Sequence, residues 1–241
     1  MTANEKLDTA CFLDLAGDFL TSGYQSARQD YHFDDDAPQK TGNAEAGDSL
    51  EQIAAEIRAC RACPLWETRT NAAPGEGAQQ PLLLVIGEGP GADEDAAGRP
   101  FVGRAGQLLD RMIDSIGFSR NSNCFIANVV KCRPPDNRDP LPEETNACAS
   151  FLERQINLLK PKYILCVGRI AAQTLLKTAE PIGKLRGEFK EFSIGGALIP
   201  FLATYHPSAL LRNEELKRPA WEDLKLLRAK MQEDGNIAAE N

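Results

Sequence analysis

Hydrophobic and polar positions follow two different periods along most of the chain. Short, almost wholly apolar runs predict strands that are buried on both faces, over residues 81–87, 124–130, 163–167 and 197–204. Around them, apolar residues recur every three or four positions and predict helices, over residues 49–59, 103–116, 142–159, 169–177 and 219–231. Strands that alternate with helices form a parallel sheet covered on both faces. We therefore predict an α/β fold, a three-layer α/β/α sandwich around a central four-stranded parallel sheet.

The first 48 residues do not share this pattern. Apolar residues recur there every fourth position, at Leu7, Cys11, Leu15 and Phe19. This spacing predicts one short amphipathic helix, and the Gly/Ala/Asn-rich stretch after it is typical of a linker. We expect residues 1–48 to be an acidic extension, disordered or weakly helical and a candidate segment for a protein partner. Residues 49–231 then form one domain, and residues 232–241 form a tail.

The net charge of −8 argues at first against a nucleic-acid partner. The charge is concentrated in the extension, because residues 1–50 hold ten acidic and three basic residues, whereas residues 51–241 hold 25 acidic and 24 basic residues. Between Arg99 and Arg138 there are seven basic and three acidic residues. This stretch is either a local cationic surface or a solvated face of mixed charge, so the charge does not exclude DNA.

The chain has none of the sequence features of a membrane or secreted protein. No apolar run approaches the ~18 residues of a membrane-spanning helix, and the N-terminus lacks the basic and apolar regions of a secretory signal. We expect a cytoplasmic protein without membrane contact. In that compartment the seven cysteines are metal ligands, redox groups or buried thiols rather than disulfides.

Four cysteines are candidate ligands of one metal centre. Cys60 and Cys63 form a C-x2-C pair, whose sulfurs converge across one turn. Cys132 and Cys148, with fifteen residues between them, would complete a set of four. Zinc sites usually repeat the short spacing, and an iron–sulfur cluster tolerates a wide pair more readily. The spacing favours a [4Fe–4S] cluster over zinc and leaves a redox-active or inert set open.

Residues that carry chemistry follow the predicted strands. In parallel sheets, ligands bind beyond the carboxyl ends of the strands. Glu88 lies in the glycine-rich turn Gly87–Gly91 after the first strand, Asn128 ends the second, and His206 follows the fourth. Phe101 lies in a loop between glycines, where it either fills the core or stacks on a ligand. Each also has a structural interpretation, as a turn, cap or packing residue.

Taken in order, four segments resemble the family 4 uracil-DNA glycosylases, which are base-excision-repair enzymes with a [4Fe–4S] cluster. The segments are Gly87-Glu88-Gly89-Pro90-Gly91, Gly98-Arg99-Pro100-Phe101-Val102-Gly103, Asn128-Val129-Val130-Lys131-Cys132-Arg133-Pro134-Pro135 and His206-Pro207-Ser208-Ala209-Leu210-Leu211-Arg212. The cysteines that match the ligand pattern of this family are Cys60, Cys63, Cys132 and Cys148. The resemblance covers about residues 50–230 and leaves the extension outside.

The resemblance implies a reaction on uracil-containing DNA. The enzyme flips uracil out of the stack and hydrolyses its N-glycosidic bond, which leaves an abasic site. In this scheme His206 donates toward uracil O2, with the Gly89 backbone amide nearby. Asn128 reads O4 and N3–H and separates uracil from cytosine, and Phe101 stacks on the ring. We expect the protein to act as a monomer.

The resemblance also implies further roles around the base and on the DNA. Glu88 positions the water, and Glu94 lines the pocket against the methyl group of thymine. Family 1 enzymes carry Asp where this turn has Gly89, so the general base stays open. Leu210 or Leu211 enters the minor groove as an apolar wedge, and Arg212 meets a phosphate.

Two other classes of protein fit parts of the sequence. An iron–sulfur electron carrier or redox sensor would explain the cysteines but not Asn128 or His206. A DNA-binding relative without turnover, including one that traps uracil covalently, would explain the resemblance. The trapping relatives carry a basic, histidine-containing insertion before the Pro-Phe motif. Residues 92–99 are short and contain no histidine, which favours ordinary turnover.

Overall fold

Six strands form one mixed sheet in the computed structural model, which describes residues 48–238. Along the chain the strands are β1 (Glu76–Gly77), β2 (Leu83–Gly87), β3 (Cys124–Asn128), β4 (Tyr163–Val167), β5 (Phe189–Ile194) and β6 (Ala197–Thr204). Across the sheet their order is β1-β3-β2-β4-β6-β5. The pairs β3–β2, β2–β4 and β4–β6 are parallel, so the predicted four-stranded parallel centre is confirmed. The helix expected in the extension lies outside the described residues.

Two antiparallel edge strands extend this centre and were not predicted. β1 pairs with β3, and β5 pairs with β6. Gly195 and Gly196 join β5 to β6, and both have positive φ angles, of 56° and 80°. A two-residue turn with positive φ at both positions matches the twist of a hairpin and favours glycine. The Gly-Gly pair between two strand-like runs was the signal for this hairpin in the sequence.

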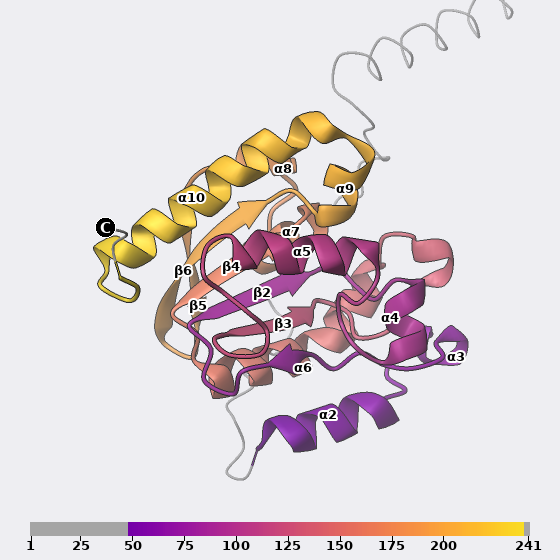
Figure 1. Cartoon of the computed structure of the whole chain (residues 1–241). Coiled ribbons are helices and arrows are strands. Elements are labelled where there is room, and N and C mark those ends of the chain that lie inside the picture. The colour runs from indigo at the N-terminus through magenta and orange to yellow at the C-terminus, as the bar shows by residue number, and fades with distance from the viewer. Residues whose placement is uncertain (1–47, 239–241) are drawn as a thin grey trace, which may run out of the picture. The chain divides into compact units, whose positions relative to one another are not determined.

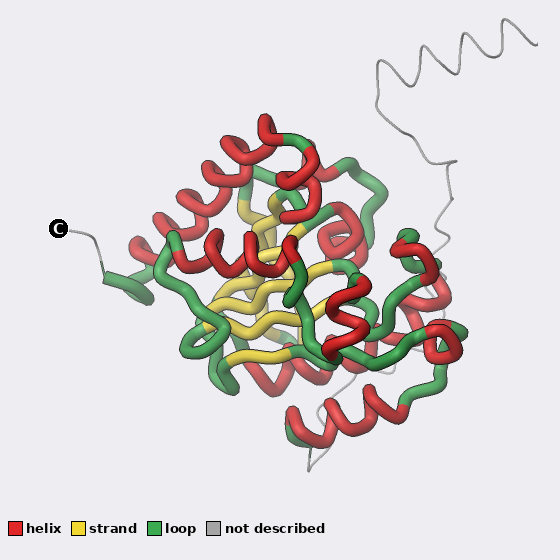
Figure 2. Tube along the Cα trace, turned by 45° about the vertical axis from the view of Figure 1, so that its right-hand side comes forward, coloured by secondary structure: helices red, strands yellow, loops and turns green. Residues whose placement is uncertain are grey.

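Helices cover both faces of the sheet (Figure 1). They are α2 (Leu50–Ala59), α3 (Leu65–Thr68), α4 (Ala92–Ala97), α5 (Arg104–Asp114), α6 (Pro142–Leu159), α7 (Arg169–Leu176), α8 (Ile182–Leu185), α9 (Pro207–Arg212) and α10 (Lys217–Glu233), with short 3-10 turns at Pro135–Asn137 and Glu214–Leu216. α2, α6 and α7 pack on one face, and α5, α9 and α10 pack on the other. Figure 2 shows the strands between the two helical layers. The three-layer prediction is therefore confirmed.

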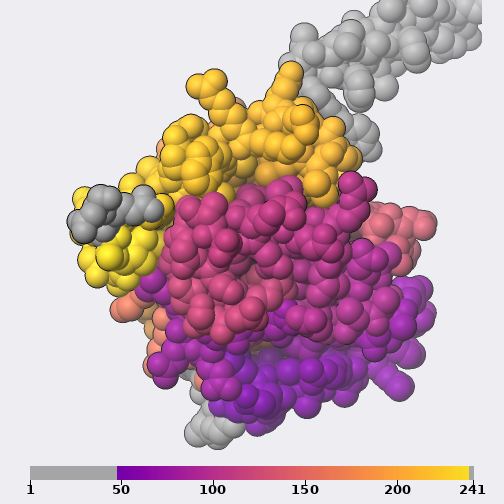
Figure 3. Space-filling view, in the orientation of Figure 1, coloured from indigo at the N-terminus to yellow at the C-terminus, as the bar shows by residue number. Residues whose placement is uncertain are grey.

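The buried side chains of each central strand alternate between two hydrophobic clusters. In β2, Leu84 and Ile86 belong to the cluster under α2, α6 and α7, whereas Leu83 and Val85 belong to the cluster under α5, α9 and α10. Successive side chains of a strand point to opposite faces, so an apolar run without polar breaks is what a strand between two helical layers requires. In Figure 3 the magenta surface around α5 adjoins the orange and yellow surface of the C-terminal helices.

Helix α2 begins where its cap predicts. The Ser49 side chain accepts a hydrogen bond from the Gln52 backbone N–H, which satisfies one of the free donors of the first turn. Arg154 of α6 forms ion pairs with Asp48 and Glu56, at 2.6 and 2.5 Å. These contacts fix both the start and the C-terminal half of α2 against α6, and Cys60 directly follows the helix.

No helix of the described residues is both long enough and apolar enough to cross a membrane.

The order of the strands in the sheet locates the ligand site. The chain passes from β2 to β3 on one side and then returns to β4 on the other side of β2. In open sheets, ligands bind at the carboxyl ends of strands where the order reverses in this way. The residues after β2 and β4, flanked by those after β3 and β6, are the candidates.

Candidate functional site

The carboxyl ends of β2 and β3 lie side by side, with Gly87 opposite Asn128 in the register. Gly87 has no room for a side chain, because a Cβ there would lie 2.5 Å from Asn128 Oδ1 and 2.5 Å from Phe101 Cζ. The rings of Phe101 and His206 are 5.6 Å apart between centroids, with an angle of 34° between their planes. The fold thus brings together three candidate residues from three separate segments. We call Asn128, Phe101 and His206 the strand-end site.

Asn128 carries an unused hydrogen-bonding group in this site. Its side chain is 1% exposed, yet neither Oδ1 nor Nδ2 has a hydrogen-bond partner among the described residues. An unpaired buried carboxamide costs free energy, so native proteins rarely leave both atoms unsatisfied. The carboxamide is therefore arranged to bind a ligand that offers both a donor and an acceptor.

Phe101 is held in an unusual backbone conformation. Its φ is 53°, in the left-handed region that costs a non-glycine residue about 1–3 kcal/mol. The Arg120 guanidinium stabilises this turn by donating to the carbonyls of Pro100 and Phe101, at 2.9 and 2.8 Å. Gly106 of α5 allows the close approach, because a Cβ there would lie 2.0 Å from the Phe101 carbonyl. The surrounding contacts thus fix the position of the ring.

His206 is held in one tautomer. Its Nδ1 accepts a hydrogen bond from the Ser208 backbone N–H at 3.1 Å, so this nitrogen carries no proton. Burial, and next the Arg212 charge, lower the pKa of His206 to about 4, although Glu94 opposes the shift. The ring is therefore neutral at pH 7, and its proton is on Nε2. His206 can donate one hydrogen bond from Nε2 to a ligand at the strand-end site.

Gly168, after β4, also shapes the site. Its φ is 100°, and a Cβ there would lie 3.0 Å from the Cβ of His206. A side chain at this position would displace the imidazole. This role was not predicted, although a glycine directly after a predicted strand was a signal.

Glu88 follows β2 and is influenced by two charged residues, Asp139 and Arg169. Burial, and next the charge of Asp139, raise the pKa of Glu88 to about 7, although the charge of Arg169 opposes the shift. Arg169 and Asp139 form an ion pair with each other. The turn itself is fixed, because the Glu88 carbonyl accepts from the Val130 N–H at 3.0 Å. Glu88 can thus exchange a proton near neutral pH.

Glu94 connects the two glycine-rich segments. Its carboxylate accepts backbone hydrogen bonds from Gly91 at 3.1 Å and from Val102 and Gly103, each at 2.9 Å. These contacts hold the turn after β2 against the turn that carries Phe101. The structure therefore gives Glu94 a positioning role that the sequence did not predict. Gly89 lies in the same turn, and a Cβ there would lie 2.8 Å from the Val130 side chain.

The segment after His206 forms the short helix α9 and separates its two leucines. Leu210 is 2% exposed and packs in the core with α5 and α10, whereas Leu211 is 40% exposed. Arg212 is also exposed. The expectation that Leu210 contacts DNA is therefore corrected, because its side chain is part of the core. Leu211 and Arg212 remain the candidates for a DNA contact.

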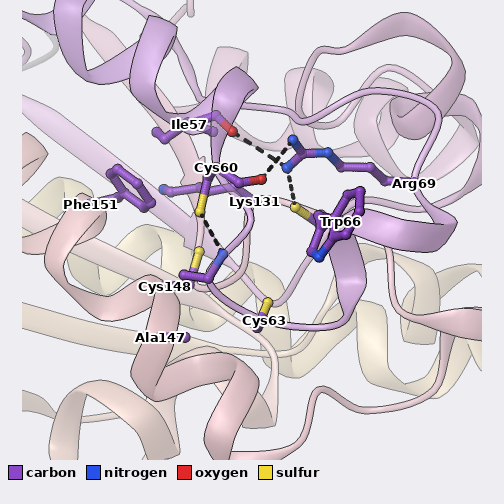
Figure 4. Close-up of a pocket in the computed structure, with 11 residues that line it drawn as sticks. Ile57, Cys60, Cys63, Trp66, Arg69, Lys131, Ala147, Cys148 and Phe151 are labelled. Atoms are coloured by element: carbon purple, nitrogen blue, oxygen red, sulfur yellow. Dashed lines mark hydrogen bonds between the residues drawn. The ribbon is translucent and has the colours of Figure 1, made fainter.

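The four candidate ligand cysteines share one pocket (Figure 4). Cys60 follows α2, Cys63 precedes α3, Cys132 follows β3, and Cys148 lies on the buried side of α6. Among residues 48–238, no group of three or more His, Cys, Asp or Glu side chains is arranged to hold a single metal ion. The four thiols thus line one pocket, from four separate segments of the chain.

Hydrogen-bond donors surround the sulfurs of this pocket. Arg69 donates to Cys132 Sγ at 2.9 Å, and the Ala62 N–H donates to Cys60 Sγ at 3.5 Å. Burial raises the pKa of Cys148 to about 11 and also raises that of Cys63. A reactive redox thiol needs a lowered pKa, so the surroundings do not activate these two cysteines as free nucleophiles.

Arg69 and Lys131 support the cysteine pocket, and neither role was predicted from the sequence. Arg69 also donates to the carbonyls of Ile57, Arg58 and Cys60, and thereby caps the last turn of α2. Lys131 is buried beside the cysteines and donates to the Asn128 carbonyl. The signal for Lys131 was a charged residue within the apolar run that leads to Cys132.

Comparison with known proteins agrees with this geometry. A family model described as the uracil DNA glycosylase superfamily matches residues 74–225. The type-4 uracil-DNA glycosylase of Saccharolobus solfataricus is 46% identical over 183 residues, which cover 74% of this chain and 84% of the relative. The type-4 enzyme of Archaeoglobus fulgidus is 42% identical, with 74% and 91% covered, and that of Sulfurisphaera tokodaii is 43% identical, with 75% and 84% covered. The region that the family model matches contains the strand-end site together with Cys132 and Cys148, and the chain belongs to the uracil-DNA glycosylase superfamily, among its type-4 members.

Proposed function

We propose that this protein excises uracil from DNA at the strand-end site, in base-excision repair, with Asn128, Phe101 and His206 as the residues that hold the base. The observation that carries the assignment is the buried Asn128 carboxamide, whose two polar atoms lack partners among the described residues. Uracil offers an acceptor at O4 and a donor at N3–H, which complement these atoms. Cytosine offers a donor and an acceptor in the opposite places, so a carboxamide held in the orientation that matches uracil rejects it.

The bond breaks as the base takes up negative charge. Cleavage of the N-glycosidic bond leaves a cationic sugar and a uracil anion, and water then adds to the sugar carbon. A neutral imidazole that donates from Nε2 stabilises the charge on uracil O2 as it forms. The Ser208 N–H keeps the proton on Nε2 by binding Nδ1, at 3.1 Å. Phe101 stacks against the flipped base, and the Gly89 N–H is a second donor beside O2.

Glu88 is the group that we assign to positioning the attacking water. The ionised carboxylate is the active form, because it accepts a proton from the water. The pKa of about 7 then predicts that kcat/KM falls roughly tenfold per pH unit below pH 7 and levels off above it. His206 does not contribute to this limb, because its pKa is about 4.

The measurement is a pH profile of excision by wild-type protein and by Glu88→Gln, which should be slow and independent of pH. A Glu88→Gln profile that still falls below pH 7 would assign the titration to another group.

Glu88 also affects the stability of the folded protein. Between pH 4.5 and 7 the unfolded chain has lost this proton and the folded chain retains it, so the free energy of unfolding falls as pH rises. Glu88→Gln should lack this pH-dependent part of the free energy of unfolding.

We also propose that Cys60, Cys63, Cys132 and Cys148 hold a [4Fe–4S] cluster. The donor set fits, because four thiols line one pocket and thiolates are the ligands of such clusters. Such a cluster supplies a cross-link between the segment before β2 and the segment after β3. It closes a loop of about 70 residues between Cys63 and Cys132, which restricts the unfolded chain.

The purified protein is then expected to be brown, with broad absorption near ~400 nm and iron bound to thiolates. Cys60→Ala should lower the iron content and the melting temperature. Cys166→Ala is the matched control, because this buried cysteine lies in β4 outside the pocket. Zinc without iron in the purified protein, or unchanged iron in Cys60→Ala, would contradict the assignment.

Leu211 is assigned to the gap that the flipped base leaves in the duplex. Leu211→Ala should slow excision from duplex DNA about tenfold, the value of one buried leucine side chain, and should leave excision from single strands nearly unchanged. Both rates are measured under single-turnover conditions. Leu226→Ala is the control, since this exposed leucine is on α10. Equal losses on the two substrates would reject the wedge.

The proposed activity is tested directly with an end-labelled oligonucleotide that contains one uracil. The protein is incubated with it, and alkali then cleaves the strand at abasic sites. We expect cleavage only at uracil, with matched thymine and cytosine strands left intact. His206→Ala, purified in the same way, controls for a contaminating glycosylase. Salt-sensitive binding to any duplex without base release would identify a DNA-binding protein without turnover instead.

A further inference from the structure

Lys131 is a buried cation that the proposed reaction does not use. It is 1% exposed, and its Nζ donates to the Asn128 carbonyl at 2.8 Å and to Gln155 Oε1 at 2.7 Å. No carboxylate of the described residues forms an ion pair with it. Both acceptors are neutral. Burying an ammonium without a negative charge nearby is unfavourable, so a partner with negative charge is needed.

The cysteine pocket is where that charge would lie. Lys131 lines the pocket together with all four cysteines, and Figure 4 shows it beside Cys60 and Cys148. Four thiolates around an iron–sulfur cluster carry a net negative charge, which an adjacent ammonium balances. Lys131 also precedes Cys132 in the chain. The same side chain therefore contacts the cysteine pocket on one side and the end of β3 on the other.

The hydrogen bond from Lys131 to the Asn128 backbone carbonyl affects base recognition, because Asn128 is the residue that we assign to reading the base. Asn128 ends this strand, and its carboxamide has no partner among the described residues that would orient it. Its position in the free protein thus depends on its backbone and on packing beside Gly87. Lys131 donates to the Asn128 backbone carbonyl and to Gln155 Oε1. Gln155 is fixed in turn, because its Nε2 donates to the Pro74 carbonyl at 2.8 Å. The Ala73 N–H donates to the Lys131 carbonyl, also at 2.8 Å.

We propose that Lys131 is a positioning residue that couples the cysteine pocket to uracil recognition: its ammonium balances the charge of the cluster and holds Asn128 in place to read the base. The inference rests on the proposed function. It gives the cluster a consequence beyond stability, because the charge that keeps Lys131 in place is the charge of the cluster. Gln155 is the second member of the link, and α6 supplies both Gln155 and Cys148.

The test compares Lys131→Met with Leu152→Ala in iron-loaded protein. Methionine keeps the length of the side chain but removes the donor and the charge. Leu152 is buried on the same helix as Gln155 and carries no polar group, so its truncation lowers stability without removing a hydrogen bond. Five quantities are measured on iron-loaded protein: the single-turnover rate on a single-stranded uracil substrate, the inhibition constant of free uracil, the reduction potential of the cluster, the affinity for DNA and the melting temperature.

We expect Lys131→Met to slow excision about tenfold and to weaken inhibition by uracil about tenfold, the effect of misplacing one hydrogen-bonding residue. The reduction potential should fall, because the reduced cluster loses a neighbouring cation. DNA affinity should not change, since the buried side chain cannot reach a phosphate. Leu152→Ala should lower the melting temperature and leave the other quantities unchanged.

Gln155→Leu provides a second variant if Lys131→Met does not fold. It leaves the charge in place and removes one acceptor of the ammonium, so we expect smaller losses in rate and in uracil inhibition. If Lys131→Met has the same excision rate and the same inhibition constant for uracil as Leu152→Ala, the proposal that Lys131 positions Asn128 is refuted. An unchanged reduction potential in Lys131→Met would refute the proposal that the Lys131 ammonium balances the charge of the cluster. A wild-type protein that releases no uracil would refute the proposed function instead, so the two failures are distinguishable.

Discussion

His206→Ala is expected to lower kcat on uracil-containing DNA by about 10²–10³-fold, the effect of removing one oxyanion donor. The loss should fall on kcat, because the hydrogen bond from Nε2 strengthens only as uracil becomes anionic. The Ser208 N–H on Nδ1 fixes this donor in the free protein. Steady-state kinetics on a single-stranded substrate, which needs no wedge, separate kcat from KM.

Ser208→Ala is the matched control for this variant. It removes the hydroxyl that contacts Nδ1 at 2.8 Å but keeps the backbone N–H that sets the tautomer. We expect its kcat to stay within a few fold of wild type, on the order of one neutral hydrogen bond. A fully folded His206→Ala protein with wild-type turnover would refute the role of the imidazole.

Asn128→Ala is expected to lower kcat/KM for uracil by about 10²-fold, because two hydrogen bonds to the base, each near 1.5 kcal/mol, are lost. Unlike His206, Asn128 contacts the neutral base as well, so both binding and turnover should weaken. Asn128→Asp replaces the amide donor with an acceptor. The exocyclic amine of cytosine can then bind where uracil O4 binds, and the selectivity for uracil over cytosine should narrow even if the overall rate falls.

Excision rates on matched uracil and cytosine strands measure this selectivity, and the melting temperature of each variant serves as its control. If His206 and Asn128 only hold the strand ends together, both alanine variants should lose activity in proportion to their loss of melting temperature. Loss of activity at an unchanged melting temperature would support direct contact with the base.

The sequence was sufficient to predict the central layers of the fold. Helix α6 and strands β4 and β6 have the predicted bounds, Pro142–Leu159, Tyr163–Val167 and Ala197–Thr204. Periodicity identifies such elements because each faces a continuous apolar layer. The edge strand β5 was missed because two adjacent charged residues, Lys190 and Glu191, interrupt its apolar positions and none of its residues is fully buried. A two-residue strand such as β1 has no periodicity to detect.

The region of the site could also be predicted, because parallel strands end at one edge and Glu88, Asn128 and His206 each follow or end a strand. The geometry could not. The positive φ of Phe101 depends on Arg120 and on Gly106 of α5. The backbone contacts of Glu94 join segments that local patterns treat separately.

The sequence by itself determined the layer order, the strand ends that form the site and the four cysteines, since all of these follow from local periodicity and residue type. Only the tertiary structure decided which leucine of α9 is exposed and where the buried Lys131 directs its ammonium. Leu210 and Leu211 are chemically identical neighbours, and packing against α5 and α10 alone distinguishes them. Contacts between distant segments decide such choices, because burial is a property of the assembled layers and not of any one segment.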